Sequence, residues 1–517
     1  MLKLGKSLAA VMAGILLTSC ACAAGEQAEQ TVLIDPENVS PVNGGVFEGW
    51  GTSLCWWANR VGYSDALTRL AAEAFCNPET GLGLNILRYN IGGGDDPSHD
   101  HITRTDSMMP GFWKDPSYDE ASGTYSWTYD WTQDAAQRNV LDQCRQTYGE
   151  NIIVEAFSNS PPYFMTNSGC SSGAKRAFEN NLRNDAYDAF ARYLADVAEH
   201  FSKEWGLRFQ SISPMNEPNT SYWQAFSEKQ EGCHFDPGAN QSRILVALAE
   251  KLKEKGLDDI LLSGTDETSI DTQALSLTQL SDEALAVISR VDTHAYAGSG
   301  RDFLLRQVSQ RDKNLWMSEV DSGDTLGKDA GEMGAGLWLA REILTDLNEL
   351  KPSAWILWQV IDNHISKDGY LGRKDSGMVD PLRGYWGVAV ADHDREQLIL
   401  TMKYYVFGQF TRYIRPGSRL IAVGKDVIAA EDPNLNRLTL VMMNPEDAEK
   451  TVRVDLSALA SSVKPGSDVQ MIRTSGGMES GEHWAELPGP VLEESGFTAV
   501  LTPYSVTTFL IPESSRQ

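Results

Sequence analysis

Residues 211–218, Ser-Ile-Ser-Pro-Met-Asn-Glu-Pro, decide the fold of this chain. They complete a short apolar run with β-strand character, residues 209–215, and follow it with a carboxylate, Glu217. Burying a carboxylate at a strand end is costly unless its charge serves a purpose. In barrels of parallel strands and crossover helices, the active polar side chains gather at the carboxyl ends of the strands. We therefore predict that residues 209–215 form one strand of an α/β fold, with Glu217 at its functional end.

The same rhythm recurs from residue 46 to residue 360: an apolar β-type run, a polar or glycine-rich loop, and a stretch of helical periodicity. Parallel strands need such crossovers, and residues 185–204 and 331–350 are two of the helices expected there. Eight β-α units predict a (β/α)8 TIM barrel over residues 46–412. The predicted strands are residues 47–57, 84–91, 152–157, 209–215, 260–264, 291–296, 314–320 and 354–360.

The C-terminal part of the chain follows a different pattern. Short alternating segments separated by Pro, Gly and Asn are typical of antiparallel β-structure. A chain of 517 residues also exceeds what one hydrophobic core usually organises. We predict that residues 413–517, with residues 31–45 from before the barrel, form an appended β-sandwich domain that ties the two chain ends together.

Composition excludes some functions. The formal net charge of −27 at pH 7 repels polyanions, so we expect no nucleic-acid partner. Hydrophobic residues make up 42% and charged residues 22%, as in ordinary folded proteins. The 14 Trp and 17 Tyr are numerous, and flat aromatic faces suit the C–H faces of sugars. Packing in the barrel core is the alternative for about half of them.

The first 24 residues have the features of an export signal. Lys3 and Lys6 precede an apolar run, residues 8–17, that is too short to span a bilayer. Residues 17–20, Leu-Thr-Ser-Cys, resemble a bacterial lipobox that would leave a lipidated Cys20, whereas residues 21–23, Ala-Cys-Ala, offer a site for ordinary release. With both interpretations open, we predict an exported protein, secreted or anchored at the cell surface, whose membrane contact is limited to a lipid on Cys20.

The five cysteines beyond the leader show no CxxC or Cys/His metal spacing, which argues against a zinc site. Cys170 and Cys233 lie in glycine-rich polar loops and are predicted to form a disulfide, with buried free thiols as the alternative. His99 and His101, with Asp96 and Asp100, resemble a metal cluster, but we interpret them as part of a solvated loop. Residues 92–94, Gly-Gly-Gly, lack the pattern of a phosphate loop.

A second glutamate, Glu319, directly follows the apolar residues 315–318 in the seventh predicted strand, whereas Glu217 follows the fourth. Strands four and seven of a barrel lie across its mouth. Glycoside hydrolysis needs one carboxyl to protonate the leaving oxygen and one carboxylate to attack the anomeric carbon. A gap of about 5 to 5.5 Å between them would give retention of configuration. The alternative for either residue is an ordinary salt bridge.

These residues carry a family resemblance. Residues 216–218, Asn-Glu-Pro, and residues 318–319, Ser-Glu, look like clan A glycoside hydrolases. Four further motifs make the chain, from about residue 47 to its end, resemble glycoside hydrolase family 30, which appends a β-sandwich to the barrel. They are Phe-Glu-Gly-Trp-Gly-Thr-Ser (47–53), Leu-Arg-Tyr-Asn-Ile-Gly-Gly (87–93), Ala-Phe-Ser-Asn-Ser-Pro-Pro-Tyr-Phe-Met (156–165) and Asp-Thr-His-Ala-Tyr (292–296).

Within the family, residues 51–57, Gly-Thr-Ser-Leu-Cys-Trp-Trp, and residues 157–166 look most like endo-β-1,6-galactanases, which cut galactan side chains of arabinogalactan. Glucosylceramidases and glucuronoxylanases share the barrel and both glutamates. Where those relatives carry Trp after Ser-Pro-Pro or Ser-Pro-x, this chain has Tyr163, which changes the sugar-stacking platform.

The resemblance implies a role for each matching position. Glu217 is expected to be the general acid/base and Glu319 the nucleophile, while Asn216 hydrogen-bonds the sugar 2-hydroxyl. Arg88 and Tyr296 are expected to favour the ionised form of Glu319, with packing as the alternative. Further substrate-binding residues are His294, Trp358 and Tyr163, for which support of neighbouring side chains is the alternative, and Asp95, which is expected to bind sugar hydroxyls.

The predicted function is a retaining glycoside hydrolase, endo-acting on β-1,6-galactan, with a polysaccharide or oligosaccharide as partner and no metal or organic cofactor. Endo action depends on whether long loops such as residues 94–130 leave both ends of the cleft open. Another family 30 activity, such as a β-glucosidase, β-xylanase or β-fucosidase, is one alternative. A carbohydrate-binding protein without turnover is another, and the intact Glu217, Glu319 and Asn216 count against it.

Overall fold

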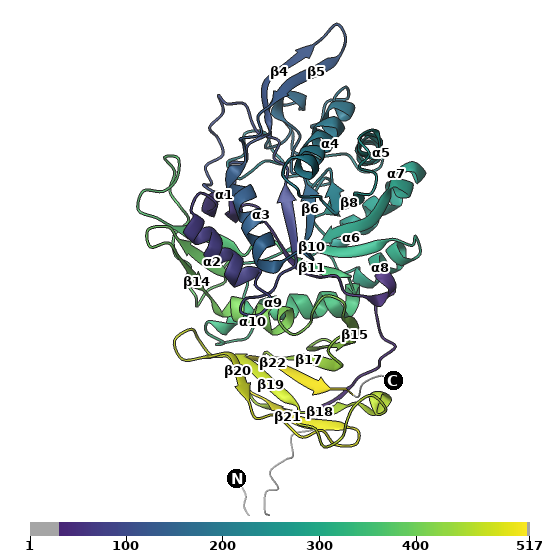
Figure 1. The fold of residues 1–517 in the computed structure, drawn as a ribbon, viewed down its shortest axis with the longest axis vertical. Helices are drawn as coiled ribbons and strands as arrows, with labels where there is room; N and C mark the ends of the chain where they lie inside the picture. Colours follow the sequence, from purple (N-terminus) through teal and green to yellow (C-terminus); the bar gives the residue numbers. More distant parts are fainter. Residues whose placement is uncertain (1–29, 514–517) are drawn as a thin grey trace, which may run out of the picture.

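A closed barrel of eight parallel strands forms the larger part of the molecule (Figure 1). The computed structural model describes residues 30–513, so the leader and the Cys20 anchor lie outside the described residues and stay predictions. Every strand overlaps one of the eight predicted runs, which confirms the (β/α)8 barrel. In hydrogen-bonded order the strands are β10 (Asn314–Val320), β11 (Ala354–Leu357), β2 (Gly49–Ser53), β3 (Ile86–Asn90), β6 (Ile153–Phe157), β7 (Ser211–Ser213), β8 (Leu261–Glu267) and β9 (Ile288–His294).

Amphipathic helices surround the barrel. In α4 (Tyr187–Lys203) the buried side chains of Phe190, Leu194, Val197 and Phe201 recur every three or four residues, so one face of the helix is buried. The predicted helix over residues 331–350 is α9 (Met333–Thr345) with a π-helical turn at Asp346–Leu350. The other helices are α1 (Trp57–Val61), α2 (Asp65–Phe75), α3 (Ala135–Tyr148), α5 (Ala239–Glu254), α6 (Ile270–Gln279), α7 (Asp282–Val287), α8 (Arg301–Ser309) and α10 (Met402–Thr411).

Two sheets at the end of the molecule where both described chain ends lie make up the additional β-domain (Figure 1). Strand β1 (Gln30–Leu33) pairs in parallel with β18 (Lys450–Asp455), and β21 (Gly496–Leu501) flanks β18 on its other side. Val32 and Ile34 are buried in the same core as Phe497 and Phe509. The larger sheet contains, in order, β15 (Arg419–Gly424), β16 (Val427–Asp432), β17 (Arg437–Asn444), β22 (Ser505–Pro512), β19 (Gln470–Ser475) and β20 (Glu482–Leu487).

Two smaller sheets are inserted into the barrel loops. A hairpin of β4 (Trp113–Asp119) and β5 (Thr124–Tyr129) projects from the end of the barrel far from the β-domain (Figure 1). A three-stranded sheet of β12 (Ile361–Ile365), β13 (Ala389–Asp392) and β14 (Gln397–Leu400) follows the last barrel strand. Among residues 30–513, no helix combines the length and apolar character needed to cross a membrane.

The predicted disulfide between Cys170 and Cys233 is wrong, because both thiols are free and buried. The Cys170 sulfur lies 3.2 Å from Ser172 Oγ, whereas the Cys233 thiol faces the His234 carbonyl oxygen at 3.6 Å. Polar loop composition does not determine which side chains meet, so the alternative of free thiols holds.

Helix α10 joins the barrel to the β-domain and carries a buried cation. Lys403 Nζ forms an ion pair with Asp321, and neither side chain is exposed to solvent. Lys403 also donates to the Tyr385 carbonyl oxygen at 3.0 Å, and Asp321 accepts the Gly387 N–H at 2.7 Å. Asp321 lies two residues after Glu319, so this pair anchors the strand end that carries the second predicted glutamate.

We expect Lys403→Met to lower the free energy of unfolding by about 3–5 kcal/mol, because it leaves the Asp321 carboxylate buried without its partner. The measurement is urea denaturation followed by tryptophan fluorescence. Adding Asp321→Asn should recover most of the loss, since replacing both charges avoids the unpaired ion. Equal stability of the single variant and the unaltered protein would contradict the anchoring role.

Candidate active site

The two predicted glutamates line one cavity of about 450 Å³ at the carboxyl ends of the barrel strands. Glu217 lies just beyond β7 and Glu319 lies on β10, the fourth and seventh strands of the barrel. The predicted residues Asn216, Tyr296 and Trp358 line the same cavity. Its other walls come from Arg104, Tyr222, Lys229, Gln230, Thr268, Asp362 and Trp386.

Glu217 is held by a left-handed backbone turn. Its φ is 47°, and its N–H donates to the Asp266 carbonyl oxygen at 2.8 Å, so the chain turns sharply after β7. Tyr222 OH donates to Oε2 of Glu217, and His294 Nδ1 lies 3.2 Å from Oε1. The residue is 8% exposed and lines the cavity, with the partners of its carboxyl already in place.

Glu319 receives two donors of its own. Tyr296 OH donates to Oε1 at 3.0 Å, and Arg88 Nη1 lies 3.4 Å from Oε2. Burial is the largest influence and raises the pKa of Glu319 to about 7; the nearby Glu217 adds to this rise, while His294 and Arg88 oppose it. Glu319 is thus a carboxyl that both protonates and ionises near neutral pH.

His294 links the two glutamates. Its Nδ1 is 3.2 Å from Glu217 and 3.5 Å from Glu319, and one carboxylate oxygen of each lies within 4.8 Å of the other. Burial by itself would lower the pKa of His294, but Glu319 and Asp266 outweigh it and raise this pKa well above its ordinary value. Both ring nitrogens face carboxylates, Nδ1 toward Glu217 and Nε2 toward Asp266, which favours the protonated imidazole.

A buried charge network forms the floor of the cavity. Arg88 on β3 donates through Nε to Glu155 at 2.9 Å and through Nη2 to Asp266 at 2.5 Å. Asp266 also faces His294 Nε2 at 3.2 Å and accepts the Ser318 hydroxyl at 2.6 Å. Burial would raise the pKa of Asp266, but Arg88 and His294 lower it below its ordinary range. Asp266 therefore stays ionised and keeps Arg88 and His294 in position.

One amide side chain and two indole rings line the cavity where a ligand would contact them. Asn216 is buried, and its Oδ1 has no hydrogen-bond partner among the described residues. Trp358 packs edge-on against Trp56 with ring centroids 5.9 Å apart, which fixes its orientation. Trp386 lies 6.0 Å from the Tyr296 ring. An unpaired acceptor beside flat apolar faces suits a sugar ring, which has hydroxyl donors at its edge and C–H groups on its faces.

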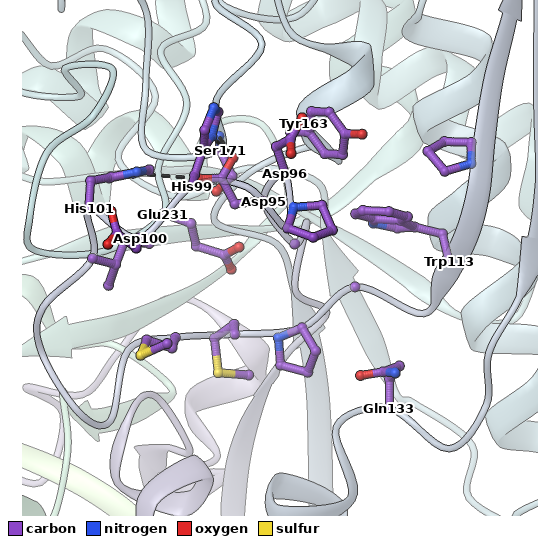
Figure 2. Close-up of a pocket in the computed structure, with 18 of the residues that line it drawn as sticks. Asp95, Asp96, His99, Asp100, His101, Trp113, Gln133, Tyr163, Ser171 and Glu231 are labelled. Carbon is purple, nitrogen blue, oxygen red and sulfur yellow. Dashed lines mark hydrogen bonds and ion pairs between the residues drawn. The ribbon is translucent and has the colours of Figure 1, made fainter. Parts of the chain in front are cut away.

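Tyr163 and Asp95, two residues predicted for the sugar site, line a neighbouring cavity of about 550 Å³ (Figure 2). The Tyr163 ring lies 5.4 Å from that of Trp113 on β4. The cavities adjoin along residues 229–231, since Lys229 and Gln230 line the first and Glu231 lines the second. The glycine run 92–94 serves packing here: a Cβ on Gly93 would lie 2.4 Å from the Ser160 carbonyl oxygen.

Sequence reasoning gave no role to several residues of the site, among them Asp266, Tyr222 and Trp386. Asp266 stands at the end of a predicted strand, a signal that could have identified it. Tyr222 is five residues after Glu217 and could have been found by its proximity. Trp386 reaches the cavity from the loop between β12 and β13, and no local pattern indicates this.

Comparison with known proteins identifies the family. The sequence profile described as O-Glycosyl hydrolase family 30 matches residues 36–270. An endo-beta-1,6-galactanase from Hypocrea rufa is 32% identical, with 96% of this chain and 98% of that protein covered. The chain belongs to glycoside hydrolase family 30. The resemblance seen in the sequence is confirmed: the family 30 chain is a glycosidase, and its substrate is a carbohydrate.

Other relatives of the family 30 glycosidase agree. An exo-beta-1,6-galactobiohydrolase from Bifidobacterium longum subsp. longum is 28% identical over 88% of this chain, which spans 37% of that longer protein. Two solved structures share the fold, each at 18% identity with 93% of this chain and 100% of the other covered. They are the catalytic domain of a family 30 xylanase C from Talaromyces cellulolyticus, with a TM-score of 0.69, and a conserved exported protein from Bacteroides fragilis, with a TM-score of 0.70.

The buried Glu231 between the cavities makes stability depend on pH. Burial raises its pKa to about 8, although Asn90 Nδ2 and the Gly93 N–H donate to it at 2.8 and 3.1 Å and lower it. An unfolded glutamate loses its proton at about pH 4.3. Between these values the folded protein binds more protons than the unfolded chain, so the free energy of unfolding falls as the pH rises.

We expect Glu231→Gln to lose less stability than the unaltered protein between about pH 5 and pH 8, because the amide cannot ionise. The difference should reach about 1.4 kcal/mol or more, the energy of one pKa unit. Calorimetric Tm values across this range give the measurement. Glu120→Gln, at an exposed position between β4 and β5, is the matched control and should keep the original slope. Parallel profiles for Glu231→Gln and the unaltered protein would refute the effect.

Proposed function

We propose that this family 30 glycosidase is a retaining endo-β-1,6-galactanase, with Glu217 as general acid/base and Glu319 as nucleophile. The observation that carries the mechanism is the approach of both glutamates to the same nitrogen of His294, at 3.2 and 3.5 Å. Their nearest oxygens lie within 4.8 Å, consistent with the separation of about 5–5.5 Å typical of retaining enzymes and shorter than the roughly 6.5–9.5 Å of inverting enzymes.

In the first step, ionised Glu319 attacks the anomeric carbon and forms a glycosyl ester. The glycosidic C–O bond breaks, and the proton of Glu217 passes to the leaving oxygen. In the second step, Glu217 takes a proton from water, whose oxygen attacks the same carbon and releases Glu319 as a carboxylate. Arg88 and Tyr296 both donate toward Glu319, so they favour its charged form during attack and release.

Asn216 and the aromatic walls support substrate positioning in this scheme. The unpaired Oδ1 of Asn216 is next to the acid/base residue, where it can accept from a sugar hydroxyl, and such contacts strengthen in the transition state. Trp358 and Trp386 offer faces for the reacting sugar, while Tyr163 and Trp113 offer a second platform in the neighbouring cavity. Asp95 also lines that cavity, and its contact with sugar hydroxyls stays a prediction.

The substrate proposal rests on the relatives and on the shape of the site. The Hypocrea rufa and Bifidobacterium longum proteins both carry β-1,6-galactosyl activity in their names. The two adjoining cavities provide room for sugars beyond the one that reacts, which supports internal cleavage of a chain. A different family 30 substrate is the second candidate, because the solved xylanase shares the fold.

We expect dearabinosylated arabinogalactan to give a ladder of galacto-oligosaccharides, whereas xylan and aryl β-glucosides stay intact. Product chromatography over time, with β-1,6-galactobiose as a further substrate, makes the measurement. Glu319→Ala protein purified in parallel controls for contaminating hydrolases. Release of monosaccharide alone, or activity confined to xylan or glucosides, would overturn the endo-galactanase proposal.

We expect Glu319→Ala to lose turnover by several orders of magnitude and sodium azide to restore part of it, because azide can attack from the vacated face. On a dinitrophenyl β-1,6-galactobioside the product should be the α-glycosyl azide, seen by NMR. Glu217→Gln should still form the glycosyl-enzyme rapidly from this activated substrate, with slow hydrolysis of the intermediate, but should lose roughly 10²- to 10⁴-fold in the first step on the polysaccharide, which needs the proton. An α-azide from the Glu217 variant instead would exchange the two roles.

A further inference from the structure

Four potential metal ligands converge on the wall of the second cavity. Asp95, His99 and His101 belong to the loop after β3, and Cys170 belongs to the loop after β6. One ligand atom from each lies within 4.8 Å of all the others. Figure 2 shows His99, His101 and Asp95 close together in the cavity wall. Two histidines, a thiol and a carboxylate are the donor types that bind zinc.

The distances match those that a tetrahedral ion imposes. His101 Nε2 is 3.6 Å from Cys170 Sγ and 3.5 Å from Asp95 Oδ2, and His99 Nδ1 is 3.2 Å from Asp95 Oδ1. The Cys170 sulfur is 3.8 Å from Asp95 Oδ2. Zinc bonds of about 2.0–2.3 Å at tetrahedral angles separate their ligand atoms by roughly 3.3–3.8 Å. The separations among His101, Cys170 and Asp95 lie within or close to this range, and His99 approaches the other oxygen of Asp95.

Direct contacts join some of these atoms, since Cys170 Sγ forms hydrogen bonds with His101 Nε2 and with Asp95 Oδ2, but other polar atoms of the cluster are left unpaired. His99 Nδ1 is buried and close to Asp95, yet it has no hydrogen-bond partner among the described residues. The Phe226 N–H donates to the Cys170 sulfur at 3.4 Å, as an outer partner does for a bound thiolate. The Ser171 N–H donates to Asp95 at 3.0 Å and orients that carboxylate. The Phe226 ring covers both histidines, with centroids at 5.0 and 5.3 Å.

We propose that Asp95, His99, His101 and Cys170 form a structural zinc-binding site. Four protein ligands close the coordination shell, which is the pattern of structural rather than catalytic zinc. The ion would fasten the loop after β3 to the loop after β6 and so fix the wall that carries Asp95 and Ser171. This proposal is independent of the roles assigned to Glu217 and Glu319, which line the other cavity. It replaces the solvated loop that the sequence indicated for His99 and His101.

The test uses the full chain, stripped with a chelator under reducing conditions and loaded with zinc or cobalt. We expect one zinc per chain by mass spectrometry of the metal, and a near-ultraviolet thiolate-to-cobalt absorption band. This band separates the site from a cobalt ion between Glu217 and Glu319, which has no sulfur ligand. Zinc should also raise the Tm of the stripped protein.

Matched cysteine variants assign the ligand. Cys170→Ser should remove the cobalt band and weaken zinc binding by more than the roughly 10- to 100-fold that loss of an outer partner costs. Cys233→Ser, another buried free thiol, should retain both. His101→Gln provides a second variant if Cys170→Ser fails to fold. Absence of zinc uptake by the unaltered protein, or an unchanged cobalt band in folded Cys170→Ser or His101→Gln protein, would overturn the proposal.

Discussion

The guanidinium group of Arg88 is the charge on which the rest of the site depends. It is fully buried, and it meets Glu155 on β6, Asp266 on β8 and Glu319 on β10. Removing an isolated ion from water costs several kcal/mol, so none of these carboxylates could stay charged inside the barrel alone. Burial works against the charge of Arg88, but Asp266 and Glu319 outweigh it and keep its pKa above the ordinary value. Arg88 therefore links three strands at a common centre and, together with Arg290 and His294, compensates the acidic side chains that gather there.

The same balance determines what the two glutamates can do. A carboxylate pair this close ionises with difficulty, because each negative charge opposes the other. Burial contributes most to the Glu319 pKa of about 7, the nearby Glu217 adds to this rise, and the cations His294 and Arg88 oppose it. The nucleophile must be ionised when it attacks, and the cations Arg88 and His294 beside Glu319 favour that form.

Short stretches of sequence were enough to predict the barrel strands and the residues at their ends. The eight barrel strands followed from apolar runs, and Glu217 and Glu319 share a cavity because parallel strands bring their carboxyl ends together. No comparable rule predicts the path that a loop takes after it leaves a strand. Asp95 and Tyr163 follow predicted strands, yet the loops take them to the second cavity. The contact of His101 with Cys170 joins positions 69 residues apart, and the same hidden loop geometry made the predicted disulfide wrong.

The pairing of β1 with β18 has a consequence for the order of assembly. Gln30 faces Val452, so the first described strand finds its partner only after most of the chain has been made. The entropy of closing a loop grows slowly with its length, and the large separation therefore adds little to the final cost. The separation does impose an order of folding events, since the barrel strands can pair before β18 has been synthesised and β1 can pair with it. A chain whose synthesis stops early keeps an unpaired strand at its amino end, and unpaired strand edges promote association between unfinished copies.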